Sequence, residues 1–155
     1  MSASPVGLEV PDFSLPATGG KDFSLSAQRG KPCVVYFYPK DNTPGCTTEA
    51  GQFRDLHAQF AASGCAVFGV SRDSLRSHEE FKAKLGLPFE LLADTAELAC
   101  RLFGVIKTKK LYGKEVQGIE RSTFLIDDRG ILRREWRALK ADGHAAAVLK
   151  AVAEL

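Results

Sequence analysis

The chain has 155 residues, which matches one typical domain, so a single domain over residues 1–155 is expected. Hydrophobic residues make up 45% of it and charged residues 26%, an ordinary globular composition that argues against disordered and fibrous classes. The formal net charge of +2 is too small to indicate a nucleic-acid-binding protein.

The first half of the chain alternates extended and helical patterns. Residues 33–38 are apolar at consecutive positions, which is typical of a central strand covered on both faces. Gly86 and Pro88 mark the end of the second helical pattern. The elements predicted here are a short hairpin made by Pro11–Pro16 and a turn at Thr18–Lys21, a strand at 33–38, a helix at Cys46–Ala62, a strand at Cys65–Ser71 and a helix at Ser74–Leu85.

The second half of the chain ends in an Ala-rich helical pattern, for which Asp142 is the expected N-cap. The predicted elements are a strand at Phe89–Leu92, a helix at Thr95–Phe103, a loop at Gly104–Gly118, a hairpin of Thr123–Asp127 and Ile131–Arg137, and a helix at Asp142–Leu155. This order predicts an α/β fold with a mixed central sheet flanked by helices. In such sheets the site lies beyond the C-terminal ends of the parallel strands.

The loop from Pro39 to Cys46 follows the first buried strand and therefore lies at that edge. Pro44 suits the first helical position, where its missing N–H costs nothing, so Thr43 is the expected N-cap. A hydroxyl at the N-cap bonds the N–H of the second or third helical residue, which places Thr43 beside Cys46. The helix dipole and the unpaired N–H groups there favour a thiolate. Cys46 is therefore predicted to be an activated nucleophile, with an ordinary buried cysteine as the alternative.

The segment Phe37–Glu49, which reads F-Y-P-K-D-N-T-P-G-C-T-T-E, resembles the peroxiredoxin active-site motif Pro-x-x-x-Thr-x-x-Cys in its bacterioferritin comigratory protein (PrxQ-like) form. Pro39, Thr43 and Cys46 match that motif residue by residue. The resemblance runs over nearly the whole chain. It implies a thioredoxin-like fold with the N-terminal β-hairpin, and thiol-dependent reduction of hydrogen peroxide or organic hydroperoxides without a cofactor.

A second stretch, Gly118–Asp127, resembles the second motif of that group, in which Arg121 matches the active-site arginine. The resemblance implies that the Cys46 thiolate attacks the peroxide and becomes a sulfenic acid. Thr43 and the backbone N–H of Cys46 would bind the peroxide oxygens, and Pro39 would shield the sulfur from water. Arg121 would hold the thiolate and stabilise charge on the breaking O–O bond, although an arginine at a strand end is more commonly a surface charge.

Glu49 stands in the first turns of the same helix. It would orient neighbouring polar groups or only interact favourably with the helix dipole.

Many relatives of this kind carry a second, resolving cysteine, five residues after the first or in the next helix, but those positions here are Gly51 and Lys82. Cys33 and Cys65 are expected at the far ends of their strands, Cys33 roughly 20 Å from the site. A disulfide needs Cα atoms within about 7 Å of each other. Cys100, on a predicted helix, remains the alternative resolving cysteine. The prediction is a one-Cys mechanism with an external thiol reductant, either thioredoxin or glutathione with glutaredoxin.

Three other functions are weaker. A disulfide reductase would need a nearby pair of thiols, and the cysteines show no C-x-x-C spacing. A non-enzymatic holdase or binding module would not need Cys46. A cysteine hydrolase would need a histidine base, but His57 lies roughly 16 Å along the same helix, and His78 and His144 are expected to be solvated near helix starts.

The remaining features concern partners and location. Met1 to Val10 contains neither a basic nor an apolar leader segment, and the apolar runs are far shorter than the roughly 20 residues that span a bilayer. A cytoplasmic monomer that binds neither membrane nor nucleic acid is expected, and the sequence shows no metal-binding constellation. The lysine-rich stretch is expected to be a solvated face that raises the local positive potential or meets an acidic reductase; its lysines are Lys107, Lys109, Lys110 and Lys114.

Overall fold

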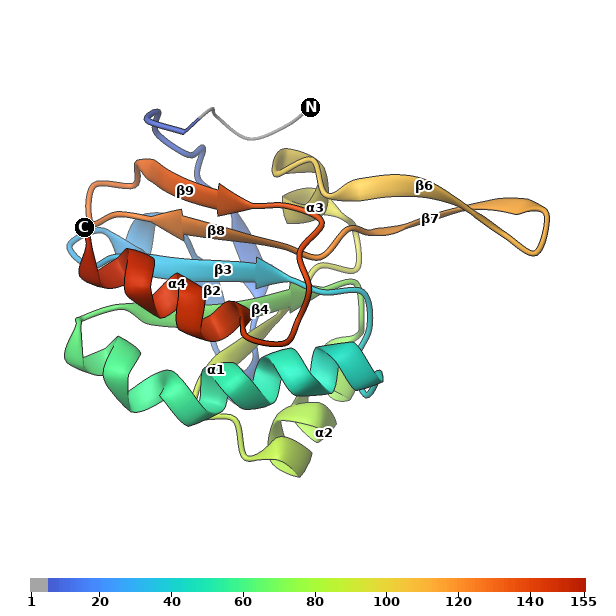
Figure 1. Cartoon of the computed structure of the whole chain (residues 1–155), viewed down its shortest axis with the longest axis horizontal. Helices are drawn as coiled ribbons and strands as arrows, with labels where there is room; N and C mark the ends of the chain where they lie inside the picture. Colours follow the sequence, from blue (N-terminus) through green and yellow to red (C-terminus); the bar gives the residue numbers. More distant parts are fainter. Residues whose placement is uncertain (1–5) are drawn as a thin grey trace.

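The computed structural model describes residues 6–155, without the side chain of Leu111. Residues 1–5, part of the stretch searched above for a leader, lie outside the described residues. A mixed sheet of five strands in the order β5-β4-β3-β8-β9 forms the centre (Figure 1). Its strands are β3 (Cys33–Phe37), β4 (Ala66–Ser71), β5 (Glu90–Ala93), β8 (Ser122–Ile126) and β9 (Leu132–Trp136). β3, β4 and β5 run parallel, whereas β8 and β9 run antiparallel to their neighbours, as the sequence predicted.

Both faces of the sheet are covered, which explains why β3 is apolar at every position. Val34 and Tyr36 point into one core, together with residues of α1 (Pro44–Ala62), α2 (Leu75–Leu85) and α4 (His144–Ala153). Val35 and Phe37 point into the other core, which also holds α3 (Leu98–Leu102) and the N-terminal strands. These are β1 (Ser14–Pro16) and β2 (Asp22–Ser24), an antiparallel pair that confirms the expected N-terminal hairpin. Helices α1, α2 and α4 thus lie on the Cys46 side of the sheet, and α3 lies on the opposite side.

The prediction of a loop at Gly104–Gly118 is wrong, because most of this segment forms a second β-hairpin. β6 (Ile106–Leu111) pairs antiparallel with β7 (Lys114–Ile119), and the pair projects from the body of the molecule (Figure 1). Tyr112 and Gly113 connect the strands with φ values of 54° and 77°. Two consecutive positive φ angles are typical of the type I′ turn, whose twist matches that of the paired strands. Neither face of this hairpin is buried, so its sequence lacks the apolar alternation by which a strand is usually predicted.

The last helix begins at His144, not at Asp142. Gly143 precedes it with a φ of 79°, a left-handed conformation that glycine adopts readily, and no side chain caps the helix. The carboxylate of Asp142 instead accepts a hydrogen bond from Gln52 Nε2 at 2.7 Å. The helix predicted at Thr95–Phe103 is also shorter, since Glu97 has a φ of 60° and α3 starts after it. Among the described residues, no helix has both the length and the apolar character needed to cross a bilayer.

Candidate active site

Cys46 lies at the start of α1, directly after the loop that leaves the C-terminal end of β3. Asn42, with a φ of 64°, turns that loop toward the helix, and Pro44 occupies the first helical position as predicted. The N–H of Thr47 closes the first turn on the carbonyl of Thr43 at 2.9 Å. The N–H groups of Gly45 and Cys46 therefore precede the first intrahelical bond and are available to a ligand. The Cys46 side chain is buried at this helix end.

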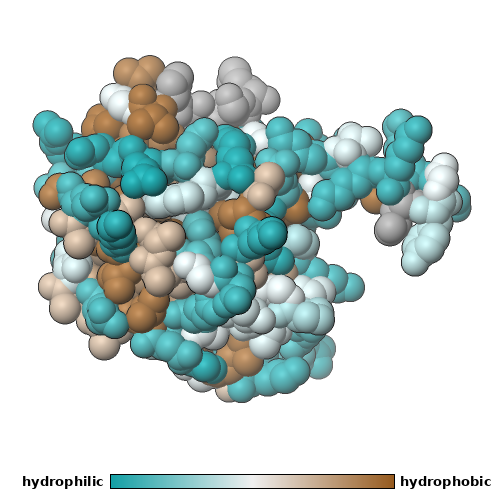
Figure 2. Space-filling model, viewed as in Figure 1, coloured by the Kyte–Doolittle hydropathy of each residue, from teal (hydrophilic) through white to brown (hydrophobic). Residues whose placement is uncertain are grey.

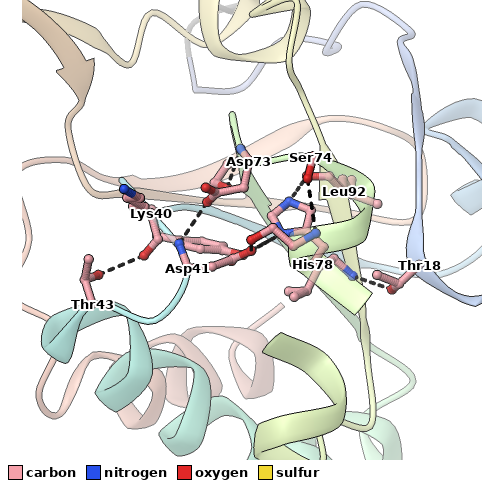
Figure 3. Close-up of polar contacts among 12 residues, drawn as sticks. Thr18, Lys40, Asp41, Thr43, Asp73, Ser74, His78 and Leu92 are labelled. Carbon is pink, nitrogen blue, oxygen red and sulfur yellow. Dashed lines mark hydrogen bonds and ion pairs between the residues drawn. The ribbon is translucent and has the colours of Figure 1, made fainter. Parts of the chain in front are cut away.

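Thr43 is the N-cap residue of α1, as predicted, but the expected cap bond from its side chain is wrong. Its hydroxyl makes no cap bond and instead donates to the carbonyl oxygen of Lys40 at 2.8 Å (Figure 3). The loop folds back on itself at Asn42, so the carbonyl oxygen of Lys40 lies within reach of the Thr43 hydroxyl proton. A hydroxyl carries one proton and two lone pairs. Because the proton is used within the loop, the half-buried Thr43 Oγ1 keeps acceptor capacity for a molecule that approaches Cys46.

Arg121 connects the sulfur to a buried carboxylate. It stands between β7 and β8, with Nη2 at 3.4 Å from Cys46 Sγ and Nη1 at 2.6 Å from Glu49 Oε1. A Cβ atom at Gly45 would come within 3.0 Å of Arg121 Nη2, so glycine allows this close approach. Burial alone would lower the pKa of Arg121, but Glu49 and Cys46 raise it above the ordinary value. Cys46 therefore has a permanent cation beside its sulfur in addition to the helix dipole.

Glu49 lies one helical turn after Cys46 and is fully buried. Burial raises its pKa to about 7, although the charge and hydrogen bond of Arg121 act in the opposite direction. Within the described part of the chain, its Oε2 has no hydrogen-bond partner, and neither has the buried hydroxyl of Tyr36. Burial, followed by the nearby Glu49 and Cys46, raises the pKa of Tyr36 and keeps that phenol neutral. Glu49 is thus hydrogen-bonded to the arginine that contacts Cys46 Sγ.

The other three cysteines differ from Cys46 in their surroundings. Burial raises the pKa of both Cys33 and Cys65 to about 12, and burial together with Asp94 raises that of Cys100. All three thiols are therefore protonated near neutral pH. Cys33 and Cys65 lie where β3 and β4 begin, at the sheet edge opposite the Cys46 loop, as expected.

Cys100 lies in the core on the other face of the sheet from Cys46. Its N–H donates to the Asp94 carboxylate at 2.7 Å, which ties it to the loop before α3. Lys82, at one position where relatives carry a resolving cysteine, pairs with Glu90, and Gly51 stands at the other. In the native fold the sheet therefore separates Cys100 from Cys46, and the other two positions, Lys82 and Gly51, carry no thiol.

A buried polar network, which the sequence reading missed, anchors the Cys46 loop to α2 (Figure 3). The Asp41 carboxylate accepts hydrogen bonds from Tyr38 at 2.6 Å, Ser77 at 2.8 Å and His78 Nδ1 at 2.8 Å. The other ring nitrogen of His78 lies 2.9 Å from the carbonyl oxygen of Leu92. Both ring nitrogens of His78 therefore face acceptor oxygens from neighbouring segments. Burial would raise the pKa of Asp41, but hydrogen bonds from His78 and Tyr38 lower it below its ordinary value.

The expectation that His78 is solvated is therefore wrong: it is fully buried. Asp73 completes the anchor by accepting the Asp41 N–H at 2.8 Å. The potential ligand atoms of Asp41, Asp73 and His78 lie within 4.8 Å of one another, a spacing that a metal ion could bridge. Three side-chain donors already occupy the Asp41 oxygens, so the cluster fits a hydrogen-bonded anchor better than a cation site.

His144 is also buried, contrary to expectation, and its Nε2 lies 2.7 Å from Thr123 Oγ1. Burial and the charge of Arg121 lower its pKa to about 4, so the ring is neutral. His57 packs against the ring of Phe89. Among the described residues, the side chain hydrogen-bonded to Cys46 Sγ is that of Arg121, whereas a cysteine hydrolase would need a histidine base at this position. Pro39 is exposed at the start of the loop.

Residues 6–135 match a family model described as the AhpC/TSA family. The Peroxiredoxin Bcp of Xanthomonas campestris is 50% identical over 149 residues, covering 94% of this chain and 93% of that protein. The Peroxiredoxin Bcp of Bacillus subtilis is 48% identical over 150 residues, covering 97% and 96%. Both relatives have nearly the same length as this chain.

Two solved structures that resemble this chain belong to proteins of the same kind as these relatives. A cysteine-to-serine mutant of Xylella fastidiosa PrxQ has a TM-score of 0.94 and 40% identity, covering 99% of this chain and 98% of that one. The Xanthomonas campestris bacterioferritin comigratory protein, solved in trapped intermediate and ligand complexes that concern its alkyl peroxide reduction activity, has a TM-score of 0.88 and 48% identity, covering 92% and 90%. These neighbours confirm the expected thioredoxin-like fold. The chain therefore belongs to the AhpC/TSA family, within its Bcp/PrxQ peroxiredoxins, and is a thiol-dependent peroxidase.

Proposed function

We propose that Cys46 is the peroxidatic nucleophile of a one-Cys peroxidase that an external thiol reduces. The observation that carries this proposal is the contact of 3.4 Å between Arg121 Nη2 and Cys46 Sγ at the N-terminus of α1. A guanidinium and a helix N-terminus both stabilise a thiolate, which is the reactive form of cysteine. The hydroperoxide is the oxidant, and the reductant supplies two thiol equivalents.

In the first step, the thiolate attacks the terminal oxygen of the hydroperoxide. An S–O bond forms, the O–O bond breaks, and its electron pair leaves on the other oxygen, which takes a proton and departs as alcohol or water. Cys46 becomes a sulfenic acid. Arg121 and the N–H of Cys46 donate to oxygens whose negative charge grows as the O–O bond breaks, which lowers the barrier to this step.

Thr43 supports the same step as an acceptor. Its own proton is engaged by the Lys40 carbonyl, so Oγ1 accepts the O–H of the hydroperoxide and orients the terminal oxygen toward the sulfur. Pro39, at the mouth of the loop, limits the access of water to the sulfur. Glu49 orients Arg121 through the hydrogen bond of 2.6 Å.

The one-Cys assignment rests on the placement of the other thiols. Cys100 lies across the sheet from Cys46, and a disulfide between them would require α3 to leave its core. The sulfenic acid is then attacked by a thiolate of the reductant, thioredoxin or glutathione with glutaredoxin. A mixed disulfide forms and water leaves; a second thiol of the reductant system then releases Cys46. We also propose that the protein acts as a cytoplasmic monomer.

Mass spectrometry after one equivalent of hydrogen peroxide tests this mechanism. We expect sulfenic acid at Cys46, trapped as its dimedone adduct, and full activity with dithiothreitol in the Cys100→Ser variant. Cys46→Ser should lose all peroxidase activity. A mass decrease of two hydrogens without dimedone labelling, or equal activity loss in both variants, would instead support the two-Cys mechanism through Cys100. Protection of unfolding client proteins by Cys46→Ser, without any peroxidase activity in the wild type, would support a holdase.

A further inference from the structure

The β6–β7 hairpin extends away from the sheet with both faces in solvent. Residues Lys107 to Lys110 are all exposed, as are Tyr112 to Gln117. Six residues per strand give the hairpin a reach of roughly 20 Å. Its surface is largely hydrophilic in the space-filling view (Figure 2).

The strand register separates the charges of the hairpin onto its two faces. Residues directly opposite each other point to the same face, and alternate residues along a strand point to opposite faces. Lys109 pairs with Val116 and shares its face with Lys107 and Lys114. We call this the lysine face. No acidic residue between Ile106 and Ile119 points to it.

On the opposite face of the hairpin, the positive charge of the lysine is balanced by an acidic residue. It carries Lys110, which lies directly across from Glu115, together with Thr108 and Gln117. An opposite-charge pair at this position stabilises the ladder and reduces the local positive potential. The two faces of one hairpin therefore differ in charge although their lysines are neighbours in sequence.

The base of the hairpin is joined to the Cys46 site. β7 ends at Ile119, and Arg121, which contacts Cys46 Sγ, follows two residues later. Arg72, which follows β4, donates to the carbonyl oxygen of Gln117 at 3.3 Å. The hairpin projects from the edge of the sheet at which β3 ends and α1 begins (Figure 1). The hairpin therefore projects at the same end of the sheet as the loop that carries Cys46 (Figure 1).

We propose that the lysine face docks an acidic surface of the protein dithiol that reduces Cys46. This inference rests on the proposed function, because an external thiol must approach the sulfenic acid at this edge. Three uncompensated lysines attract an acidic partner over a distance of about one Debye length and raise its association rate. The docked thiolate attacks Cys46 Sγ, forms a mixed disulfide and displaces hydroxide, which leaves as water. The second thiol of the partner then attacks the partner's sulfur and releases the Cys46 thiolate.

The hairpin offers a matched pair of variants for the test. Lys109→Glu and Lys110→Glu make the same charge change at adjacent exposed positions, on the lysine face and on the opposite face. The probe is thioredoxin, kept reduced by its reductase and NADPH, with dithiothreitol as an uncharged reductant in parallel assays. We expect Lys109→Glu to lower kcat/KM for thioredoxin by about tenfold or more at low salt, and Lys110→Glu to lower it several-fold less. The difference should shrink at high ionic strength, and activity with dithiothreitol should be unchanged in both variants.

The outcomes separate this inference from the proposed function. Equal effects of the two variants, or a salt-independent loss, would overturn docking on the lysine face. Turnover with thioredoxin that matches the wild type in Lys109→Glu, combined with lost binding to anionic vesicles or to an oligonucleotide, would assign the face to those anions instead. A wild type inactive with both reductants would refute the proposed function itself.

Discussion

Glu49 holds a charge in surroundings that disfavour it, and this has a consequence for stability. Its pKa rises from an ordinary 4.5 to about 7 in the fold because of burial, against the opposing effect of Arg121. Between these two values the folded state binds the proton more tightly than the unfolded state. The free energy of unfolding contributed by Glu49 therefore falls as the pH rises through this window and becomes constant above about 7.

Substitution of Glu49 by Gln removes this titration. We expect the stability of the wild type, relative to Glu49→Gln, to fall by roughly 3 kcal/mol between about pH 5 and pH 8. His144 has a pKa lowered to about 4, so its contribution rises with pH, but it is present in both proteins and cancels in the difference. Urea unfolding across this pH range measures the effect. Parallel stability profiles would show that Glu49 titrates at its ordinary value.

Two substitutions of Thr43 test whether its hydroxyl oxygen orients the hydroperoxide toward Cys46. Thr43→Val removes the acceptor while keeping the shape, and Thr43→Ser keeps the oxygen. If Oγ1 orients the hydroperoxide, the rate constant for Cys46 oxidation should fall by about 10²–10³-fold in the Val variant, and the Ser variant should stay close to the wild type. Single-turnover peroxide consumption in a stopped-flow instrument measures this rate. Similar rates for Thr43→Val and the wild type would show that the Thr43 hydroxyl does not orient the hydroperoxide and only bonds the Lys40 carbonyl within the loop.

At the scale of elements, the Asp41 network joins the Cys46 loop to α2. Removing one partner of a buried ion pair costs about 3–5 kcal/mol because the other charge stays buried and unpaired. We therefore expect His78→Ala to lower the free energy of unfolding by that amount, whereas Ser77→Ala, which removes one hydroxyl hydrogen bond to the Asp41 carboxylate, should cost about 1.5–3 kcal/mol. Urea unfolding at neutral pH compares the two.

A second readout separates anchoring of the loop from stability alone. His78→Ala should also slow Cys46 oxidation, since Lys40, which holds the Thr43 hydroxyl, precedes Asp41 in the loop. Equal destabilisation by both variants, or an unchanged oxidation rate in His78→Ala, would show that the network does not position the loop.

The sequence predicted the elements that have local signals. Pro44 marks the start of α1, and the apolar run of β3 requires a buried position in the sheet. The β6–β7 hairpin was missed because both of its faces are exposed and its turn, Tyr112–Gly113, is not one of the common hairpin dipeptides.

Among the site residues, the motif identified Cys46, Thr43 and Arg121. The approach of Arg121 to Cys46 depends on the pairing of β3 with β8, which local patterns do not encode. His78 was missed because its partners, Asp41 in the Cys46 loop and Leu92 in β5, come from two other segments, and they meet only when the chain is folded.

For the whole molecule, the central sheet separates the thiols. Cys46 and Cys65 lie in the core on one face, although at opposite ends, and Cys33 and Cys100 lie in the core on the other. All four are buried, but only Cys46 stands at a loop edge beside a cation; the pKa values of the other three are raised by burial. A thiol reagent reacts with the thiolate, so reaction of the remaining three requires that the fold opens.

Thiol counting with an aromatic disulfide reagent tests this arrangement in the reduced native protein. We expect one fast-reacting thiol, absent from Cys46→Ser, and three slow ones whose reaction rate follows global unfolding and becomes fast in urea. Cys100→Ser should keep the fast phase and lose one slow thiol. A Cys100 that reacts quickly without denaturant would show that α3 opens readily, and the sheet would then no longer keep Cys100 from serving as a resolving cysteine.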